Sequence, residues 1–581
     1  MMKAKHLRFF LTVTFVEGCL AFLFFMSRRS DQENARLFGY SYLRLGIAGA
    51  ELIVLVLLAL ITFKVFRNER WLEHITQNVA CYLEEPTGET GKQLFTVQRG
   101  FIIALVALTE IFLFTWLSIP PTLRTMIIWA ILICFQAWLI LRIVYAPDYR
   151  KRPSLAANFR SKWNGLLPVQ RKVFIILAIL GLVNFLAFIP FNHLPDIFGR
   201  VNIYSDERVI YPDIVKALTP QVNFSATLYA VFESWQWPYG YPYLPISGSV
   251  LIIPRLIFGT TFARHIYINI FLLRQFVSVL PMVLALMLAV YLVTSYKSIP
   301  ISVGMFVFLL LTPGIVKFNY QFWHPDSIIL FLILLTIYFL QKDNLRFGRF
   351  FYLAAVACGL ATAIKVWGLF FFMAIAGYLI AGLLQHKLTF KKLIISGLLF
   401  ILTMLGTIII SNPPLLSPNS ARLALVSLTD QQEKILHGFE GIDATGYYNT
   451  GLMNWLKYYG KHYMKAYFFF FAFFALGSGA LWGSKKMLSR FLLAWCVPAT
   501  IFLVYFSATK NFQYLLQVAI PLYCGAFLFP NITDNPPNSK WLAFLAKPLT
   551  RKIVWGITLA FFASQFIINL VILVLFAQRG R

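Results

Sequence analysis

The chain is built mainly of apolar runs that are about as long as a bilayer is thick. One of them reads "VFIILAILGLVNFLAFIPF" (residues 173–191), and similar runs recur along the 581 residues. Hydrophobic residues make up 59% of the chain and charged residues 13%, whereas a soluble protein carries roughly 25% charge. In lipid, only helices and closed barrels satisfy their own backbone, and these runs lack the alternation of barrel strands. We therefore expect an all-α polytopic membrane protein.

The apolar runs fall into two groups, which a basic linker separates. Four runs come first, near 7–26, 46–66, 100–118 and 123–145, and they predict an N-terminal four-helix membrane module over residues 1–146. The linker, residues 147–172, holds seven Lys or Arg and no acid within "YRKRPSLAANFRSKWNGLLPVQRK". A second membrane domain is predicted over residues 173–581. Its eleven expected helices lie near 173–191, 268–296, 299–317, 326–341, 349–366, 368–384, 393–411, 464–483, 491–508, 511–530 and 552–577.

The distribution of Lys and Arg predicts the topology. Cytoplasmic loops carry an excess of these residues, so the linker belongs to the cytoplasm and the next helix leads outside. The connections "QKDNLRFGR", "HKLTFKK" and "GSKKMLSR" are basic and fall inside by alternation. The extracytoplasmic loops are then 192–265, whose last part is an amphipathic helix, and 412–463. The net charge of +28 is explained by topology and by attraction to the lipid bilayer, and we expect no nucleic-acid partner.

Carboxylates gather on the side that this topology places outside. Asp206 and Glu207 lie in "SDERVIYPD" within the first outer loop, and Asp326 lies in "HPDSIILF" at the outer end of a later helix. Acids that follow Ser205 at a helix start are also ordinary capping chemistry. The functional alternative is catalytic: one carboxylate deprotonates an acceptor, and another orients the first or holds a metal ion.

Three cations map to the same side, namely Arg208, Lys365 and Lys510. Lys365 lies in "GLATAIKVWGLFFF", between two short apolar runs. Its aliphatic stem allows it to reach the membrane interface without any other role. Cations beside carboxylates also suit a reaction on an anionic lipid head group, where they stabilise a departing phosphate.

Aromatic residues cluster in the first outer loop. Trp235, Trp237, Tyr239 and Tyr241 are candidates for stacking on a sugar or a prenyl chain, and interfacial anchoring is the alternative. His324, two residues before the later aspartate, is a candidate metal ligand, acid–base group or phosphate donor, and plain packing explains it equally well.

Several of these motifs resemble the C-type (GT-C) glycosyltransferases. "SDERVIYPDIVKAL" is similar to the Asp-Glu motif of their first extracytoplasmic loop, most of all in the branch of the lipid A aminoarabinose transferase and the protein O-mannosyltransferases. "WQWPYGYPYLPISGSVLIIPRLIFG", "HPDSIILFLILLTIYFLQ", "GLATAIKVWGLFFF" and "SATKNFQYLLQVAIPLYCGAF" resemble further motifs of that branch, in the same order. The resemblance covers about residues 171–580 and implies a GT-C bundle of about eleven transmembrane helices.

The resemblance also implies a reaction. A polyprenyl-phosphate-linked sugar donor would pass its sugar, with inversion, to a lipid, glycan or protein acceptor at the outer face. Asp206 would be the base or the acceptor-orienting acid, with Glu207 beside it, and Asp326 would be the second acid. Lys365 and Lys510 would meet the donor phosphate, with Arg208 a weaker candidate. A divalent cation, Mg²⁺ or Mn²⁺, at Asp206 and Asp326 is a further option.

Two features depart from this family. We expect no soluble C-terminal domain of the kind that some relatives carry, and four additional N-terminal helices, to which we assign no chemistry. The leading alternative function is a transporter or flippase of lipid-linked glycans, which should show inverted repeats and polar residues near the membrane midplane. The expected location is a bacterial inner membrane, with the active site on the extracytoplasmic face.

Overall fold

The computed structural model divides the chain into two compact units. The first runs to Asn158 apart from Arg142–Val144, and the second holds those three residues and Phe159–Arg581. The structure describes residues 11–12, 15–16, 18–19, 22–23, 26, 42–67, 100–101, 104–105, 108–109, 121–145, 163–193, 205–232, 239–437, 451–458, 460–507, 512–534, 544–545 and 547–579.

Two long helices are described in the first unit. Helix α2 spans Tyr42–Arg67 and α5 spans Pro121–Tyr145, so two of the four predicted N-terminal segments are helical as expected. The predicted segments near 7–26 and 100–118 lie mostly outside the described residues.

The described part of the second unit consists of helices and their connections and contains no strand. The label α marks an α-helix, and η marks a 3₁₀- or π-helix. Its first half holds α7 (Pro168–Ala187), α8 (Ile189–His193), α9 (Ser205–Ala217), α10 (Phe224–Phe232), α11 (Tyr243–Phe258), η3 (Gly259–Arg264), α12 (Ile266–Leu273), η4 (Arg274–Val279), α13 (Leu280–Thr294), α14 (Ile299–Leu310), α15 (Pro313–Ile315) and η5 (Val316–Tyr320). Its second half holds α16 (Asp326–Asp343), α17 (Arg349–Ile364), η6 (Val366–Phe371), α18 (Phe372–Leu384), α19 (Phe390–Ser411), η7 (Pro413–Leu416), α20 (Pro418–His437), α21 (Leu452–Tyr458), η9 (Gly460–His462), α22 (Ala466–Trp482), α23 (Lys486–Ile501), η10 (Phe502–Phe506), η11 (Phe512–Leu515), α24 (Leu516–Leu528), η12 (Phe529–Thr533) and α25 (Pro548–Arg579).

The long helices of the second unit reverse direction one after another, so their connections gather at two ends. These two ends differ chemically. At one end, Asn192 after α7 donates to the carbonyl of Tyr320, which lies just before α16. At the other end, Gln170 at the start of α7 donates to the carbonyl of Ser295, just after α13. The basic connections after α13, α16, α18 and α22 all lie at this second end, which we call the basic end. The first end holds the predicted carboxylates, and we call it the acidic end.

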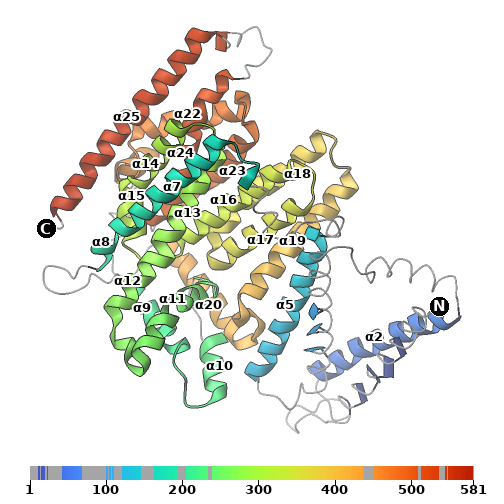
Figure 1. The fold of residues 1–581 in the computed structure, drawn as a ribbon. Coiled ribbons are helices and arrows are strands. Elements are labelled where there is room, and N and C mark those ends of the chain that lie inside the picture. Colours follow the sequence, from blue (N-terminus) through green and yellow to red (C-terminus); the bar gives the residue numbers. More distant parts are fainter. Residues whose placement is uncertain are drawn as a thin grey trace. The chain divides into compact units, whose positions relative to one another are not determined.

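Helix α16 lies at the centre of the bundle between α13 and α17, and α17 in turn packs against α19 (Figure 1). Two of the flanking segments, η4 and η5, are π-helical turns next to the acidic end. Such widened turns often occur at functional sites. The central helices therefore bring the residues at their ends close together at the acidic end.

Helix α11 with η3, Tyr243–Arg264, is long and apolar enough to cross a membrane, although the sequence predicts it as part of the outer loop. Its contacts keep it at the acidic end: it packs against α9, α12 and η4. Tyr211 of α9 donates to the carbonyl of Ala263, and Asn269 of α12 donates to that of Phe262. Helices α11 and α12 therefore pack against each other, and α12 continues through η4 into α13.

Every helix expected after residue 173 coincides with an observed helix or with two or three consecutive helices. By length and composition, seven helices of the described part are fit to span a membrane, or up to eight if the bent pair α14 and α15–η5 forms one span. Helices α17, α18 and α22 are apolar but shorter than this criterion requires. The structure thus supports a multi-pass helical membrane protein.

The two ends can be tested by labelling. Arg208 is exposed at the acidic end and Lys387 at the basic end. We expect Arg208→Cys and Lys387→Cys to react with a membrane-impermeant maleimide from opposite sides of the membrane, with wild-type protein as the background for native cysteines. Labelling of both variants from the same side would contradict the arrangement described above.

Candidate active site

Four side chains at the acidic end form a continuous chain of polar contacts. The Tyr239 hydroxyl donates to Asp206 Oδ2 at 3.1 Å and lies 2.7 Å from His324 Nε2. On the other side of the ring, His324 Nδ1 lies 2.6 Å from Asp326 Oδ2. Asp206 is in the first turn of α9, Tyr239 precedes α11, and Asp326 begins α16. Residues separated by more than a hundred positions thus join into one network.

Lys365 closes this network on its second side. Its ammonium lies 2.9 Å from Asp326 Oδ1, and both side chains are almost fully buried. The backbone of Lys365 is extended (φ −159°, ψ 138°), so α17 ends there before η6 begins. The ammonium also lies over two aromatic rings, 5.5 Å from the centre of Tyr239 and 4.7 Å from that of Tyr514. Tyr514 belongs to the late "KNFQYLL" motif, which therefore reaches the site.

The loop that carries Tyr239 is docked on the end of α17. The backbone N–H of Gly240 donates to the carbonyl of Ile364 at 2.8 Å, and that of Tyr241 donates to Asn412 Oδ1 at 2.8 Å. A Cβ at position 240 would stand 1.6 Å from the carbonyl oxygen of Ala363, so only glycine allows this approach. These backbone bonds place the Tyr239 hydroxyl between Asp206 and His324.

Glu207 occupies a different position from its neighbour Asp206. It is fully buried and pairs with Arg274 through two bonds, Nε to Oε1 at 2.8 Å and Nη2 to Oε2 at 2.6 Å. Its Oε1 also accepts the backbone N–H of Trp323 at 2.7 Å. Both oxygens are therefore committed to holding α9 against η4 and the segment before α16. This geometry is that of a positioning residue, whereas Asp206 is partly exposed.

Contacts with η4 and with neighbouring aromatic rings also fix the segment that carries His324. The Ser278 hydroxyl of η4 donates to the carbonyl of Phe322 at 2.8 Å and accepts the backbone N–H of His324 at 3.2 Å. The ring of Trp323 stacks on Tyr243, with ring centres 5.4 Å apart. His324 itself stacks on Phe322 and meets Tyr239 edge to face. The imidazole is therefore held in one orientation.

The remaining predicted residues divide into two groups. Arg208 is exposed, and Tyr241 is buried, with its backbone bound to Asn412. Lys510, Trp235 and Trp237 lie outside the described residues. The sequence analysis overlooked Arg274 and Asn412. Arg274 had a usable signal, because an arginine inside the apolar run "IFLLRQFVSV" requires a partner.

Burial sets the protonation states of two loop residues. Removal from water lowers the pKa of His324 below its ordinary value of 6.5, although the nearby Asp326 carboxylate opposes the shift. The imidazole is therefore neutral near pH 7. Burial, assisted by the Asp206 carboxylate, raises the pKa of the Tyr239 hydroxyl well above 10. Tyr239 therefore keeps its proton and works as a hydrogen-bond donor.

The donor set does not fit the Mg²⁺ or Mn²⁺ ion that the sequence suggested at Asp206 and Asp326. Such ions take oxygen ligands, but both oxygens of Asp326 already meet nitrogen atoms of His324 and Lys365. The Lys365 ammonium would stand beside the metal. Within the described ranges no group of three His, Cys, Asp or Glu side chains is arranged to hold a metal ion. We derive no step through a metal.

Comparisons of this chain with protein-family models, with curated proteins and with solved structures each gave no match. The resemblance to the GT-C enzymes therefore rests on the motifs in the sequence.

The ion pair between Glu207 and Arg274 can be tested through stability. Glu207→Gln leaves the Arg274 charge buried without its partner, which typically costs about 3–5 kcal/mol. We expect a clearly lower thermal midpoint for the purified protein in detergent. The matched control is Asp430→Asn, which removes a carboxylate from an exposed pair with Lys434 and should cost about 0–1 kcal/mol. Equal midpoints for the two variants would refute the positioning role of Glu207.

Proposed function

We propose that this protein is an integral membrane glycosyltransferase of GT-C type, which transfers a sugar from a polyprenyl-phosphate donor to an acceptor at the extracytoplasmic face. The observation that carries the proposal is the network of Asp206, Tyr239, His324, Asp326 and Lys365 at the acidic end. The proposal includes a bundle of eleven membrane crossings in the second unit and a location in a bacterial inner membrane.

The number of protons in the network supports a general-base role for Asp206. His324 Nδ1 lies 2.6 Å from Asp326 Oδ2, and this carboxylate favours the neutral tautomer with its proton on Nδ1, which leaves Nε2 as an acceptor. Tyr239 then has one hydroxyl proton and two neighbours that need it, His324 Nε2 and Asp206 Oδ2. A proton that arrives on Asp206 resolves this conflict, because Asp206 then donates to Tyr239 and Tyr239 donates to His324. Both contacts of the Tyr239 hydroxyl are hydrogen bonds in the state that follows proton uptake.

Exposure divides the roles of the two aspartates. Asp206 is partly exposed, so an acceptor hydroxyl can reach it, whereas Asp326 is 1% exposed and both of its oxygens lie within 2.9 Å of a nitrogen atom of His324 or Lys365. Asp206 would take the acceptor proton as the sugar carbon is attacked and the donor phosphate departs with the bonding electrons. Asp326 would orient His324 and Lys365. Because the attack is direct, the reaction needs no covalent sugar intermediate and inverts the configuration.

The placement of charge favours transfer over transport. A transporter of lipid-linked glycans is expected to bind its cargo near the midplane, between broken helices of two repeats. In this structure the buried charges of the network lie where α9, α16 and α17 begin or end. A reaction at one membrane surface therefore accounts for their position.

The catalytic assignment predicts a large loss of rate without loss of the fold. Asp206→Asn keeps the shape but cannot take a proton, so we expect transfer from a prenyl-phosphate sugar to fall by about 10²–10⁴-fold. Asp326→Asn should also impair transfer, because His324 and Lys365 lose the charge that holds them. Asp213→Asn, on the same helix, is the control and should keep wild-type activity. Full activity of the Asp206 and Asp326 variants in detergent would exclude the mechanism.

The network also predicts an acid limb in the pH profile. Neutral His324 is the working form, and its lowered pKa keeps it neutral above pH 6.5, so kcat/KM should be flat there with respect to this group. As the pH falls below 6.5 and then through the pKa of His324 in the folded protein, the imidazole gains a proton. Protonated His324 no longer competes for the Tyr239 proton, so Tyr239 donates to Asp206 alone, which weakens Asp206 as a base. His324→Gln should move the acid limb to lower pH, and an unchanged limb would contradict the role of His324.

A further inference from the structure

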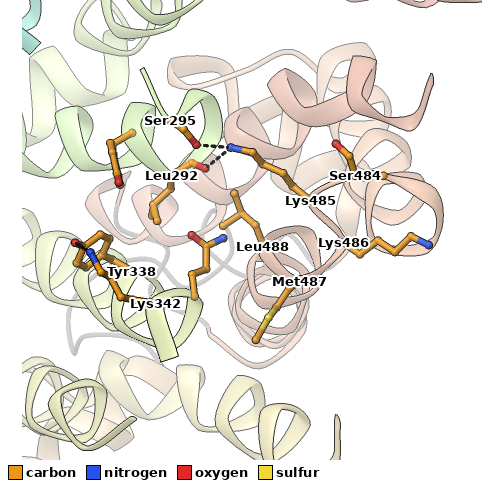
Figure 2. A pocket seen from close by; sticks show the side chains of 12 residues that line it. Leu292, Ser295, Tyr338, Lys342, Ser484, Lys485, Lys486, Met487 and Leu488 are labelled. Atoms are coloured by element: carbon orange, nitrogen blue, oxygen red, sulfur yellow. Dashed lines mark hydrogen bonds between the residues drawn. The ribbon is translucent and has the colours of Figure 1, made fainter. Parts of the chain in front are cut away.

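A cavity of about 640 Å³ lies at the basic end, away from the network described above. Three segments form its walls: the C-terminal turn of α13 with Ser295, the last turn of α16, and the connection from α22 into α23 (Figure 2). The lining contains Lys342, Lys485 and Lys486 and no Asp or Glu. The cavity therefore carries positive charge without a carboxylate in its wall.

Lys485 is a fixed cation in this wall. Its ammonium donates to the carbonyls of Leu292 and Val293 at 3.1 and 2.8 Å, and to the Ser295 hydroxyl at 3.0 Å. These bonds cap the C-terminal end of α13, where a cation is favourable. They satisfy its hydrogen atoms but do not neutralise its charge. Burial, together with the nearby Lys297, lowers the pKa of Lys485 to about 8.

Lys342 supplies a second cation on the opposite wall. It is exposed, and its ammonium lies 3.3 Å from the Tyr338 hydroxyl. The adjacent Asp343 does not compensate it, because that carboxylate accepts bonds from the Tyr378 hydroxyl and from the backbone N–H groups of Phe347 and Gly348. Lys486 differs from both, since its nitrogen points away from the other labelled side chains in Figure 2.

The start of α23 adds a third positive feature. Most helices begin with a side chain that accepts a hydrogen bond from the first turn, but the N-cap here is Lys485, with no side-chain cap bond and no acid in the first turn. Met487 and Leu488 of that turn line the cavity. The positive end of the helix dipole therefore lies beside the same space as the two ammonium groups.

We propose that this cavity binds a phosphate group, carried either by a lipid head group or by a soluble phosphate compound. A phosphate offers several strong acceptor oxygens, so it can accept hydrogen bonds from Lys342 while the charge of Lys485 and the α23 N-terminus attract it. The hydroxyl of Ser484 and the amide of Gln341 in the lining supply further donors. The volume exceeds the need of a monatomic anion. The inference does not depend on the proposed glycosyl transfer.

The experiment measures binding to the purified full-length protein in detergent and needs no transfer assay. One arm titrates inorganic phosphate and follows the thermal midpoint, with chloride at equal ionic strength as reference. The other arm uses native mass spectrometry to count bound phosphatidylglycerol against phosphatidylcholine. We expect wild-type protein to bind at least one of the two probes selectively. Binding of phosphatidylglycerol alone identifies a lipid source, and binding of phosphate identifies a soluble one.

Two lysine variants decide whether the cavity is responsible. Lys342→Gln should weaken the selective binding about tenfold, which is the usual scale for one charge-assisted bond. Lys486→Gln removes the same charge from a side chain that points away, and should change binding less than about twofold on that scale. The proposal is overturned if neither probe binds selectively to wild-type protein, if Lys342→Gln binds like wild type, or if the two variants weaken binding equally.

Discussion

The buried ion pair between Glu207 and Arg274 is the interaction on which the acidic end depends. It joins the first turn of α9 to a π-helical turn inside the long α12–α13 helix, and it also holds the backbone of Trp323. An unpaired charge at this depth would be very costly, so the two side chains fix the relative position of three segments. Asp206 directly precedes Glu207 on α9, and His324 directly follows Trp323. Both ends of the polar network therefore take their positions from this pair.

The sequence predicted the helices and the gathering of charge, because both follow from local patterns. Apolar runs of membrane length gave the helices after residue 173, and basic loops gave the two ends. The sequence did not predict which groups pair. In the sequence, Asp206 and Glu207 are both acids in the first turn of a predicted helix, and nothing local distinguishes them. In the structure, Glu207 turns into the core toward Arg274, and Asp206 turns toward Tyr239. The sequence predicts ring stacking for Tyr239 and does not predict the hydrogen bonds of its hydroxyl, because the docking of Gly240 on α17 is a tertiary contact without a local signature.

The end of α17 at Lys365 explains how this part of the acidic end accommodates both a buried lysine and the loop that carries Tyr239. When α17 ends, the carbonyls of its last turn lose their helical partners. Gly240 takes the carbonyl of Ile364, while Asn412 at the end of α19 holds the backbone of Tyr241. The Lys365 side chain then turns to Asp326. One break thus satisfies a helix end, anchors the Tyr239 loop and pairs a buried cation.

The charge balance of the acidic end bears on how a donor phosphate would bind under the proposed function. Among the described residues, the carboxylates of Asp206, Glu207 and Asp326 face two buried cations, Arg274 and Lys365, and both are already paired. A phosphate would add negative charge to a site with an excess of it, so a further cation is required. Arg208, exposed on α9, and Lys510 are the candidates from the sequence. The motif of Lys510 reaches the site through Tyr514, whose ring lies beside the Lys365 ammonium. By this argument, donor binding would depend more on Lys510 than on Lys365.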